Sequence, residues 1–445
     1  MSTTCIKGLV LTMDEKGTVL PRGLVVFDGV DGVITAVDKE ENLGKHKCDV
    51  LEGGENHVVM PGLINTHTHT PMIVFQGLFS GLTGFNWLKR VWFLEGLLKP
   101  SDIYLSAKMA MVLMLENGIT TFSDHYFYEE EVVKAVEEVG MRAVLAKSIV
   151  EYSEHAPKHS VKDSVDFALK YANAAGGRVS TMIGIHSLYS CSIETVREAV
   201  EASLSTNIKI HMHFSESLHE VEHVKEKYGT TPAELAEKVG LMEARPLLAH
   251  ATYLTDRDLE ILGRYKPGVA YSPFTIMSWG QGVARVHELL EKGVHVSLAT
   301  DGPLTSGDLC LFKEMKFTIA VQSSVYRYPG RIAPRNVLEM ATRIAALNLG
   351  LENKVGSLEP GKRADILVLK PRLSRSIGLH EDPYHTVVYN LGCESVSMVY
   401  VNGKKLVDRG NVVGISVERL YKRVLDIRER IMNEAGSGME GFSRH

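Results

Sequence analysis

The sequence predicts an α/β protein: a (β/α)8 TIM barrel with a small β-sandwich domain that the N- and C-terminal segments form together. From about Val58 to Asp301, apolar strand-like runs alternate with amphipathic helical stretches, a pattern typical of parallel strands joined by helices. Short β-branched runs precede and follow that region, and neither flank is large enough to bury a core alone. The predicted divisions are 1–58 and 362–415 for the two parts of the β domain, 59–361 for the barrel, and 416–445 for a C-terminal helix and polar tail.

Each predicted element follows from a local pattern of apolar and turn residues. The N-terminal strands are Ile6–Met13, Gly23–Phe27 and Gly32–Val37. The eight barrel strands are Val58–His69, Thr120–Phe127, Arg142–Ile149, Thr181–Leu188, Ile208–Phe214, Pro246–Tyr253, Gly268–Pro273 and His295–Asp301. The helices between them include Ile103–Asn117, Glu130–Val139, Val161–Ala172, Glu194–Ala202, Asp256–Gly263 and Ala284–Lys292.

The segments outside this alternation also have predicted places. Thr70–Leu98 is too long for a simple connection between the first two barrel strands, so we expect it to lie over the barrel mouth. After a helix at Val337–Leu349, the predicted strands are Asp365–Leu369, His385–Tyr389, Val396–Val401 and Lys405–Val407. The polar end of the chain, Glu434–His445, is expected to be frayed or disordered.

The composition excludes several classes of protein. The chain has 445 residues, 44% of them hydrophobic, which is ample for a large core. Its net charge of -5 provides no broad basic field, so no nucleic-acid partner is expected. No run approaches about 18 apolar residues and no secretory signal pattern opens the chain, so no membrane contact is expected and the cytoplasm is the expected location.

The cysteines are few and scattered. They are Cys5, Cys48, Cys191, Cys310 and Cys393, an odd number without a Cys-x-x-Cys pair. We therefore expect neither a disulfide framework nor a cysteine-based zinc site.

The most informative motif is His67-Thr68-His69, at the end of an apolar run. Residues two apart in a strand point to the same side, so both imidazoles can face one point. Other predicted barrel strands end in similar residues, namely His186, His211-Met212-His213, His250 and Asp301. Because the carboxyl ends of barrel strands meet over one pocket, this repetition indicates a shared site rather than unrelated polar ends.

Three imidazoles and a carboxylate, from His67, His69, His213 and Asp301, are predicted to bind one divalent metal ion with room for a water. Zinc is the first expectation and iron the alternative. Such an ion lowers the pKa of its water toward about 7 and so provides hydroxide at neutral pH. Asp301 is also predicted to act in catalysis, by transferring a proton.

Two further residues have predicted catalytic roles. Glu216 follows His213 by three residues, which places a carboxylate beside the metal to move the water's proton to the substrate. His250 is predicted to orient or polarise the attacking water. His211 shares the inward side with His213 but lies one layer deeper, which favours a core or supporting role.

With these residues in this order, the chain resembles the amidohydrolase superfamily, in the branch of the S-adenosylhomocysteine/5'-methylthioadenosine deaminases and the triazine chlorohydrolases. The resemblance covers nearly the whole chain and is carried by Met60–His69, His213–Glu216, Leu248–His250, Ala299–Gly302 and Gly356–Asp365. It implies one metal ion and no carboxylated lysine. The predicted fourth barrel strand has no lysine at its end that would argue otherwise.

The resemblance also implies a nucleoside pocket, in which Glu216 and His250 would contact the substrate. Trp87 occupies the position of a tryptophan that lies under the nucleoside, and Glu95 that of a glutamate on the ribose hydroxyls. His186 matches a histidine that contacts the ribose. The alternative for Trp87 and Glu95 is a packed helix face with a solvated acid.

The chain departs from the family pattern around the substrate. Lys147 stands where those deaminases have an arginine for the homocysteine carboxylate; it stays a substrate-binding candidate, but without the bidentate fork of arginine. The segments Tyr271–Ile276, Trp279-Gly280 and Pro303–Ser306 also differ from the family pattern. His125 is a further pocket candidate, with a core or supporting role as the alternative.

The predicted function is a metal-dependent aminohydrolase that deaminates an adenosine-type nucleoside, 5'-methylthioadenosine or S-adenosylhomocysteine, by attack of a metal-bound hydroxide. The alternative is a deaminase or chlorohydrolase of another aminated heterocycle, such as a guanine derivative, a pterin or a triazine. A non-catalytic metal-binding scaffold is disfavoured, because Glu216 is not needed as a ligand. The expected partners are a small-molecule substrate and further copies of the chain in a homo-oligomer.

Overall fold

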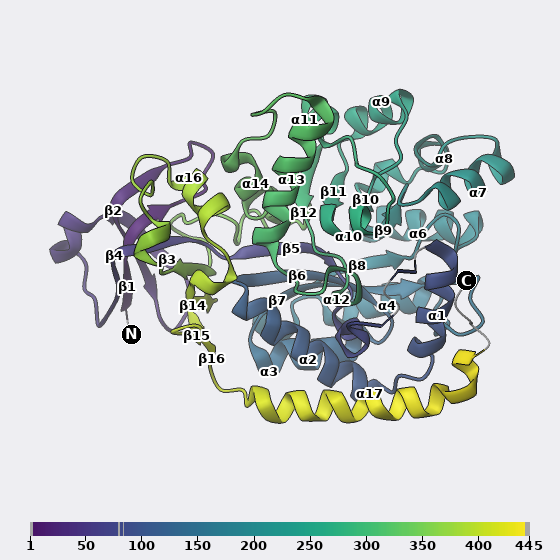
Figure 1. The fold of residues 1–445 in the computed structure, drawn as a ribbon, viewed down its shortest axis with the longest axis horizontal. Coiled ribbons are helices and arrows are strands. Elements are labelled where there is room, and N and C mark those ends of the chain that lie inside the picture. Colours follow the sequence, from purple (N-terminus) through teal and green to yellow (C-terminus); the bar gives the residue numbers. More distant parts are fainter. Residues whose placement is uncertain (1–2, 79–80, 83, 441–445) are drawn as a thin grey trace.

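The computed structural model describes residues 3–78, 81–82 and 84–440. Two eight-stranded sheets organise these residues, a parallel barrel at the centre and a second sheet at one side of it (Figure 1). The predicted fold class, a (β/α)8 barrel with a β domain built from both ends of the chain, is confirmed.

The barrel strands follow one another in chain order around the sheet. They are β5 (Leu63–Thr68), β6 (Ile119–Tyr126), β7 (Arg142–Ile149), β8 (Val179–Ile185), β9 (Ile210–Phe214), β10 (Leu247–His250), β11 (Gly268–Tyr271) and β12 (His295–Leu298). The first and last strands of this order also approach each other, and single hydrogen bonds link them and the residues that follow β12. The Thr66 hydroxyl donates to the Leu298 carbonyl (2.8 Å), and the Asp301 N–H donates to the His67 carbonyl (3.1 Å).

Helices connect the strands and form the outer layer. The longer ones are α2 (Pro100–Glu116), α3 (Glu129–Val139), α4 (Val161–Tyr171), α6 (Ile193–Thr206), α7 (Leu218–Tyr228), α9 (Asp256–Tyr265) and α13 (Leu311–Tyr326). Shorter helices are α8 (Pro232–Lys238), α10 (Pro273–Ser278), α11 (Val286–Glu291), α12 (Pro303–Ser306), α14 (Pro334–Met340) and α15 (Arg343–Asn348). Several begin with a hydroxyl cap, such as Ser160 of α4 and Thr255 of α9, each of which accepts a backbone N–H three residues ahead.

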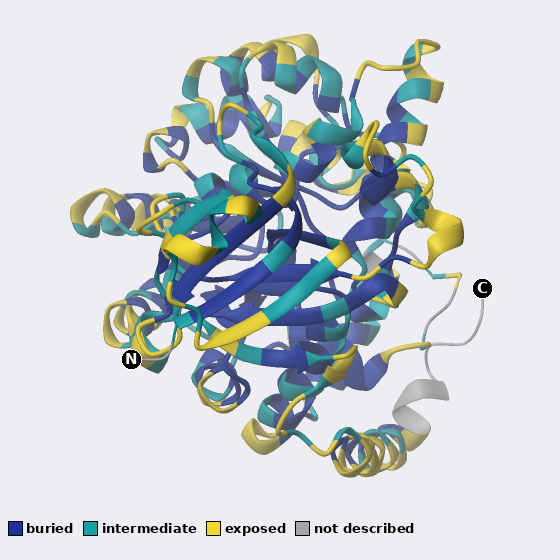
Figure 2. Cartoon of the chain, turned by 90° about the vertical axis from the view of Figure 1, so that its left-hand side faces the viewer, coloured by how far each residue is buried: buried dark blue, intermediate teal, exposed yellow. Residues whose placement is uncertain are grey.

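The second sheet joins both ends of the chain. Its strands run in the order β16 (Asn411–Val412), β15 (Lys404–Asp408), β14 (Val396–Val401), β13 (Ile366–Leu369), β4 (Val50–Pro61), β1 (Thr3–Leu11), β2 (Val19–Asp28) and β3 (Ile34–Lys39). Phe27 and Val59 from the first part pack with Ile366 and Tyr400 from the second, so each part covers apolar surface of the other. Figure 2 shows these strands buried along much of their length.

The predicted strand Val58–His69 is divided between the two sheets. β4 ends at Pro61 in the terminal sheet, and β5 begins at Leu63 in the barrel. Gly62 lies at the division, where a Cβ atom would come within 2.1 Å of the Thr120 side chain. Only glycine allows the chain to pass this close to β6 as it enters the barrel.

One prediction for the C-terminal region is wrong. His385–Tyr389 was predicted as a strand but is helical, in α16 (Pro383–His385) and the turn Thr386–Asn390. The Asp382 side chain accepts the His385 N–H (2.9 Å) and Pro383 occupies the first turn, which starts a helix despite the β-branched residues that follow.

The predicted polar tail, Glu434–His445, overlaps the end of α17 (Val417–Glu440), whose helical geometry is interrupted at Gly436; residues 441–445 lie outside the described part. α17 packs along α2 on the lower side of the view in Figure 1. None of the described helices is both long enough and apolar enough to cross a membrane.

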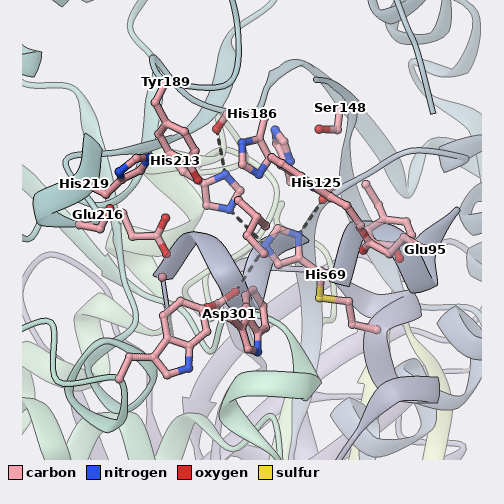
Figure 3. Close-up of a pocket in the computed structure, with 18 of the residues that line it drawn as sticks. His69, Glu95, His125, Ser148, His186, Tyr189, His213, Glu216, His219 and Asp301 are labelled. Atoms are coloured by element: carbon pink, nitrogen blue, oxygen red, sulfur yellow. Dashed lines mark hydrogen bonds and ion pairs between the residues drawn. The ribbon is translucent and has the colours of Figure 1, made fainter. Parts of the chain in front are cut away.

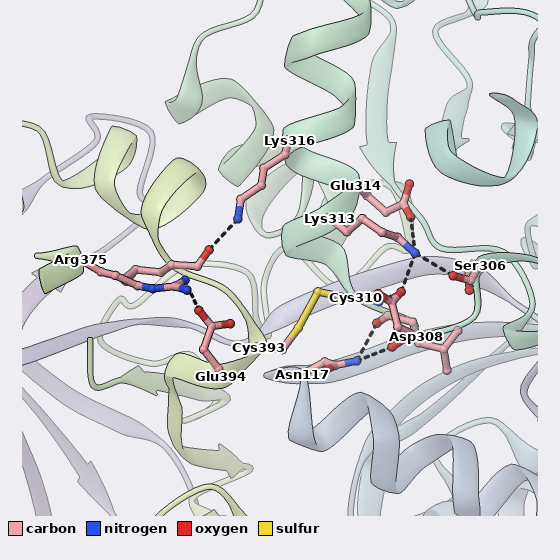
Figure 4. Close-up of a disulfide and its surroundings, with 12 residues drawn as sticks. Asn117, Ser306, Asp308, Cys310, Lys313, Glu314, Lys316, Arg375, Cys393 and Glu394 are labelled. Atoms are coloured by element: carbon pink, nitrogen blue, oxygen red, sulfur yellow. Dashed lines mark hydrogen bonds and ion pairs between the residues drawn. A yellow bond between two sulfur atoms is a disulfide. The ribbon is translucent and has the colours of Figure 1, made fainter. Parts of the chain in front are cut away.

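The expectation of no disulfide framework is also wrong. Cys5 of β1 forms a disulfide with Cys48, which lies just before β4, and Cys310 and Cys393 form another. Figure 4 shows the second bond, which joins the start of α13 to the segment before β14. The partners are 43 and 83 residues apart in sequence, so the local spacing of the cysteines carried no sign of either pair. Because disulfides are rare in the reducing cytoplasm, this pairing removes one argument for the cytoplasmic location, which stays a prediction.

Candidate metal centre and adjoining pocket

Three histidines converge at the carboxyl ends of the barrel strands. His67 lies in β5, His69 follows that strand directly, and His213 lies in β9. One nitrogen atom from each lies within 4.8 Å of the others. The Asp301 Oδ1 atom completes the group, 3.8 Å from His67 Nε2 and 3.4 Å from His69 Nε2. The structure therefore brings together all four residues that were predicted to bind a metal.

The hydrogen bonds of His69 and His213 fix their tautomers. His69 Nδ1 donates to the His125 carbonyl (2.8 Å), and His213 Nδ1 donates to the His186 carbonyl (2.9 Å). Burial lowers the pKa of both imidazoles to about 4, so both are neutral at pH 7. Their protons are therefore on Nδ1, and each Nε2 carries a lone pair.

The lone pairs of this group face a common point, which is the arrangement that a metal ion needs. His69 Nε2 and His213 Nε2 are 3.2 Å apart, yet neither has a proton to donate to the other. His67 Nε2 is buried without a hydrogen-bond partner, while His67 Nδ1 is held by His211 Nε2 (2.9 Å). A cation between these nitrogens and Asp301 would satisfy all of them. The donor set fits one divalent metal ion, and His211 has the supporting role that was one of its predicted alternatives.

Left-handed backbone conformations position three functional strand ends. Ser215 (φ 47°) precedes Glu216, while His250 (φ 77°) and Asp301 (φ 61°) adopt the conformation themselves. This conformation is unfavourable for residues other than glycine and tends to persist where function requires it. At Asp301 the Gly302 N–H donates to the carboxylate (2.6 Å), and the Thr68 hydroxyl donates to the Asp301 carbonyl (2.9 Å).

Glu216 and His250 lie together beside the histidine cluster. Glu216 Oε1 is 3.7 Å from His250 Nε2, and the His250 ring stacks on that of His213 with centroids 5.5 Å apart. Burial, with Asp301 and Glu220 nearby, raises the pKa of Glu216 well above its usual range. A carboxyl group whose protonated form is favoured in this way can hold and deliver a proton.

The histidine cluster forms one end of a pocket (Figure 3). Predicted site residues that line it are His69, Trp87, Glu95, His125, His186, His213, Glu216 and Asp301. Trp87 and Glu95 belong to α1 (Gly84–Glu95), so the segment after the first barrel strand does lie over the barrel mouth as predicted. His186 Nδ1 is 2.8 Å from the Ser190 hydroxyl, which leaves its Nε2 for other contacts.

Glu95 is a buried acid rather than a solvated one. It is 2% exposed, and its Oε1 atom has no hydrogen-bond partner. Burial raises the pKa of Glu95 to about 8, and the neighbouring Tyr126 hydroxyl only partly opposes this shift. The alternative interpretation of Glu95 as a surface residue is therefore wrong.

Lys147 is not among the described residues that line the pocket. Its Nζ atom forms an ion pair with Glu130 (2.5 Å) near the start of α3. The next residue along β7, Ser148, lines the pocket instead. The structure thus gives no support to Lys147 as a substrate-binding residue, because the two residues point to opposite sides of the strand.

The sequence reasoning missed several pocket residues. Among them are Met72, Trp92, Phe127, Ser148, Tyr189, His219 and Gln281. His219 had a local signal, since it follows Glu216 by three residues. Tyr189 follows His186 at the same interval, with its ring 5.9 Å from the His186 ring. Trp279, noted only as a departure in sequence, lines the pocket with its ring 4.7 Å from that of Trp87.

Comparison with known proteins agrees with this geometry. A family model described as "Amidohydrolase family" matches residues 58–406. A 5-methylthioadenosine/S-adenosylhomocysteine deaminase of Desulforudis audaxviator is 34% identical over 412 residues, which are 92% of this chain and 94% of the relative. A 5'-deoxyadenosine deaminase of Methanosarcina acetivorans is 34% identical over 430 residues, which are 96% of this chain and 98% of the relative.

Solved structures show the same fold at lower identity. An adenosine deaminase from Xanthomonas campestris with bound zinc superposes with a TM-score of 0.91 at 22% identity, covering 97% of this chain and 99% of its own. An atrazine chlorohydrolase from Arthrobacter aurescens complexed with zinc superposes with a TM-score of 0.87 at 24% identity, covering 96% of this chain and 100% of its own.

Proposed function

This chain belongs to the amidohydrolase family, and from that premise we propose that it is a zinc-dependent deaminase of adenosine-type nucleosides. The observation that carries the proposal is the shared pocket: His69, His213, Asp301 and Glu216 lie on the same cavity as Glu95, His186 and Trp87. The relatives named as deaminases of adenosine-type nucleosides support the substrate class. The predicted homo-oligomer stays a prediction.

The metal would be held by His67, His69, His213 and Asp301. When bound, a divalent ion of this kind lowers the pKa of a coordinated water toward about 7 and so makes a nucleophile available at neutral pH. The zinc in two solved structures of the same fold supports zinc as the ion.

The protein's own residues then handle the protons of the reaction. Deamination adds water to a ring carbon that bears an amino group and releases ammonia, leaving a carbonyl group. We assign Glu216 to take a proton from the attacking water and to give it to the adjacent ring nitrogen. Asp301 transfers the second proton to the departing amine. His250, 3.7 Å from the Glu216 carboxylate, orients the water.

The far end of the pocket would hold the sugar. Glu95 is buried with a free acceptor atom, and a ribose hydroxyl can donate to it. His186, which directly follows β8, presents its remaining ring nitrogen, and the indole of Trp87 offers an aromatic face for the nucleoside. Lys147 has no role in this proposal.

The test is an ammonia-release assay on zinc-loaded protein. The substrates are 5'-methylthioadenosine, 5'-deoxyadenosine, adenosine, adenine, guanine, a pterin and an aminotriazine. We expect turnover of the nucleosides and little of the free bases. Glu95→Ala should lower kcat/KM for the nucleosides by about 1–3 kcal/mol, because a buried hydroxyl would lose its partner. Equal turnover of bases or triazines, with Glu95→Ala silent, would contradict the proposal.

A further inference from the structure

The pocket has an unusual balance of charge for a site that would receive a polar metabolite. The described residues that line it include three acids, Glu95, Glu216 and Asp301, but no lysine and no arginine. Of the histidines in the same lining, His69 and His213 are predicted metal ligands, while His125 and His186 are hydrogen-bonded to the Ile185 carbonyl and the Ser190 hydroxyl. A negatively charged group in this pocket would therefore lack a counterion among these residues.

The alternation of β7 explains why the nearest lysine does not contribute. Val144 and Ala146 belong to one apolar cluster, which includes Ile64 and Met182 of other barrel strands, whereas Ala143 and Leu145 belong to a different one, the large core. Ser148 continues the inward side and Lys147 the outward side. On that outer side, Lys147 is bound by Glu130 at 2.5 Å. Bringing its charge into the pocket would require breaking this pair and turning the strand over.

Ser148 lies where a nucleoside would extend beyond its sugar. In the β7–β8 register Ser148 is opposite Gly184, and the His186 N–H donates to the Ile149 carbonyl (3.1 Å), so Ser148 is beside the predicted ribose contact. Figure 3 shows Ser148 beyond His186 and away from Glu216 and Asp301. The Ser148 hydroxyl is buried without a hydrogen-bond partner. If the base binds at the metal end, as the proposed function requires, the 5' group would extend toward this wall.

We propose that the pocket selects nucleosides whose 5' substituent is uncharged and small or apolar, and that Ser148 lines the subsite for that substituent. This inference rests on the proposed deaminase function and narrows it: 5'-methylthio and 5'-deoxy nucleosides are substrates, whereas the amino-acid tail of S-adenosylhomocysteine is rejected. Met72, Leu88, Phe127 and the Trp87–Trp279 pair supply the apolar surface of the same pocket.

The first test compares two nucleosides of nearly equal size on the wild-type enzyme, 5'-butylthioadenosine and 5'-(3-carboxypropylthio)adenosine. We expect kcat/KM for the carboxylate to be lower by about 100-fold or more, the loss expected when a buried charge has no partner. If the kcat/KM values for the two compounds differ by less than about five-fold, the inference is overturned while the deaminase function stays in place. If the enzyme deaminates none of the three nucleosides, the two test compounds and 5'-methylthioadenosine, that result would instead contradict the proposed function.

The second test supplies the missing cation. Ser148→Arg should reduce the ratio of kcat/KM for the neutral compound to kcat/KM for the carboxylate by at least ten-fold. The reason is that the new guanidinium can pair with the carboxylate. Ser148→Met is the matched control, similar in reach but uncharged, and should leave the ratio in favour of the neutral compound. A Ser148→Arg enzyme with an unchanged ratio would overturn the placing of the 5' group beside Ser148. If this variant does not fold, the wild-type comparison still decides the charge preference.

Discussion

The carboxylate of Glu220 accepts a hydrogen bond from the backbone N–H of Glu216 at 2.9 Å. Glu220 is fully buried in the first turn of α7, and the helix cap Ser217 accepts the Glu220 N–H (3.3 Å). The start of this helix therefore holds the short loop, with its left-handed Ser215, that presents the Glu216 carboxylate to the pocket. Glu220 is a positioning residue for the proposed proton shuttle.

Glu220→Ala should lower kcat by about 10- to 100-fold, because it leaves the partly buried Glu216 N–H without its partner, which costs about 1–3 kcal/mol. KM and metal content should change little, since Glu220 does not line the pocket. Glu220→Gln keeps one acceptor oxygen and should recover part of the loss. The readouts are kcat, KM and the pH profile of kcat, which should shift in Glu220→Ala as Glu216 moves. An unaltered kcat and profile would refute the positioning role.

Glu216→Gln should lower kcat by at least about 100-fold, since general acid–base catalysis contributes that much and the amide cannot exchange the proton. Metal content should stay at the wild-type level, because Glu216 is not one of the predicted ligands. Steady-state kinetics combined with metal analysis of the same preparation check both parts. Near-normal turnover by a fully loaded variant would reject this mechanism.

Purified protein supplied with zinc should hold one metal ion per chain, and Asp301→Ala should abolish turnover and weaken retention of the ion.

His211→Ala should weaken metal affinity by about 10- to 100-fold, because it removes the partner that orients His67. Ser123→Ala is the control and should have a smaller effect on metal affinity. The Ser123 hydroxyl contacts the other ring nitrogen of His211, but the distance of 3.3 Å is long for a hydrogen bond. Competition with a chelator measures all three. Two ions per chain, or wild-type affinity in His211→Ala, would contradict the arrangement.

Glu95 should make stability depend on pH. Burial raises its pKa from 4.5 to about 8, so the folded state keeps a proton that the unfolded chain has already lost between these values. Because the folded state binds more protons, the contribution of Glu95 to the free energy of unfolding falls as pH rises from about 4.5 to about 8. Glu95→Gln removes this effect and should therefore gain stability relative to wild type on going from pH 5.5 to pH 8. Urea unfolding at both pH values measures the difference in the free energy of unfolding between Glu95→Gln and wild type. If that difference is the same at both pH values, Glu95 is ionised in the folded state.

Thiol titration of unfolded protein tests the two disulfides. Without reductant, only Cys191 should react, which gives one thiol per chain; after reduction all five cysteines should react. Cys191→Ser should bring the unreduced value to zero. Five reactive thiols in protein never exposed to reductant would show that neither bond forms, and would restore the argument for a reducing compartment.

The barrel and the predicted metal site could both be inferred from the sequence alone, because both depend on local patterns. Alternating strand and helix periodicity specifies the eight strands, and the spacing of His67 and His69 places both at one strand end. His213 and Asp301 could be added because the topology of a barrel brings all strand ends to one edge. Glu95 and His186 were found through resemblance to a family, and the structure places both on the pocket.

The fold was needed to establish which neighbouring side chains face the pocket and which distant side chains meet. Lys147 and Ser148 are adjacent in sequence, and their opposite directions depend on the side of β7 that faces the barrel interior. The pairs Cys5–Cys48 and Cys310–Cys393 depend on how segments far apart in the chain pack together. The approach of Trp279 to Trp87 likewise depends on how the end of α10 packs against α1. Each is a long-range contact, whose free energy comes from packing that local sequence patterns do not encode.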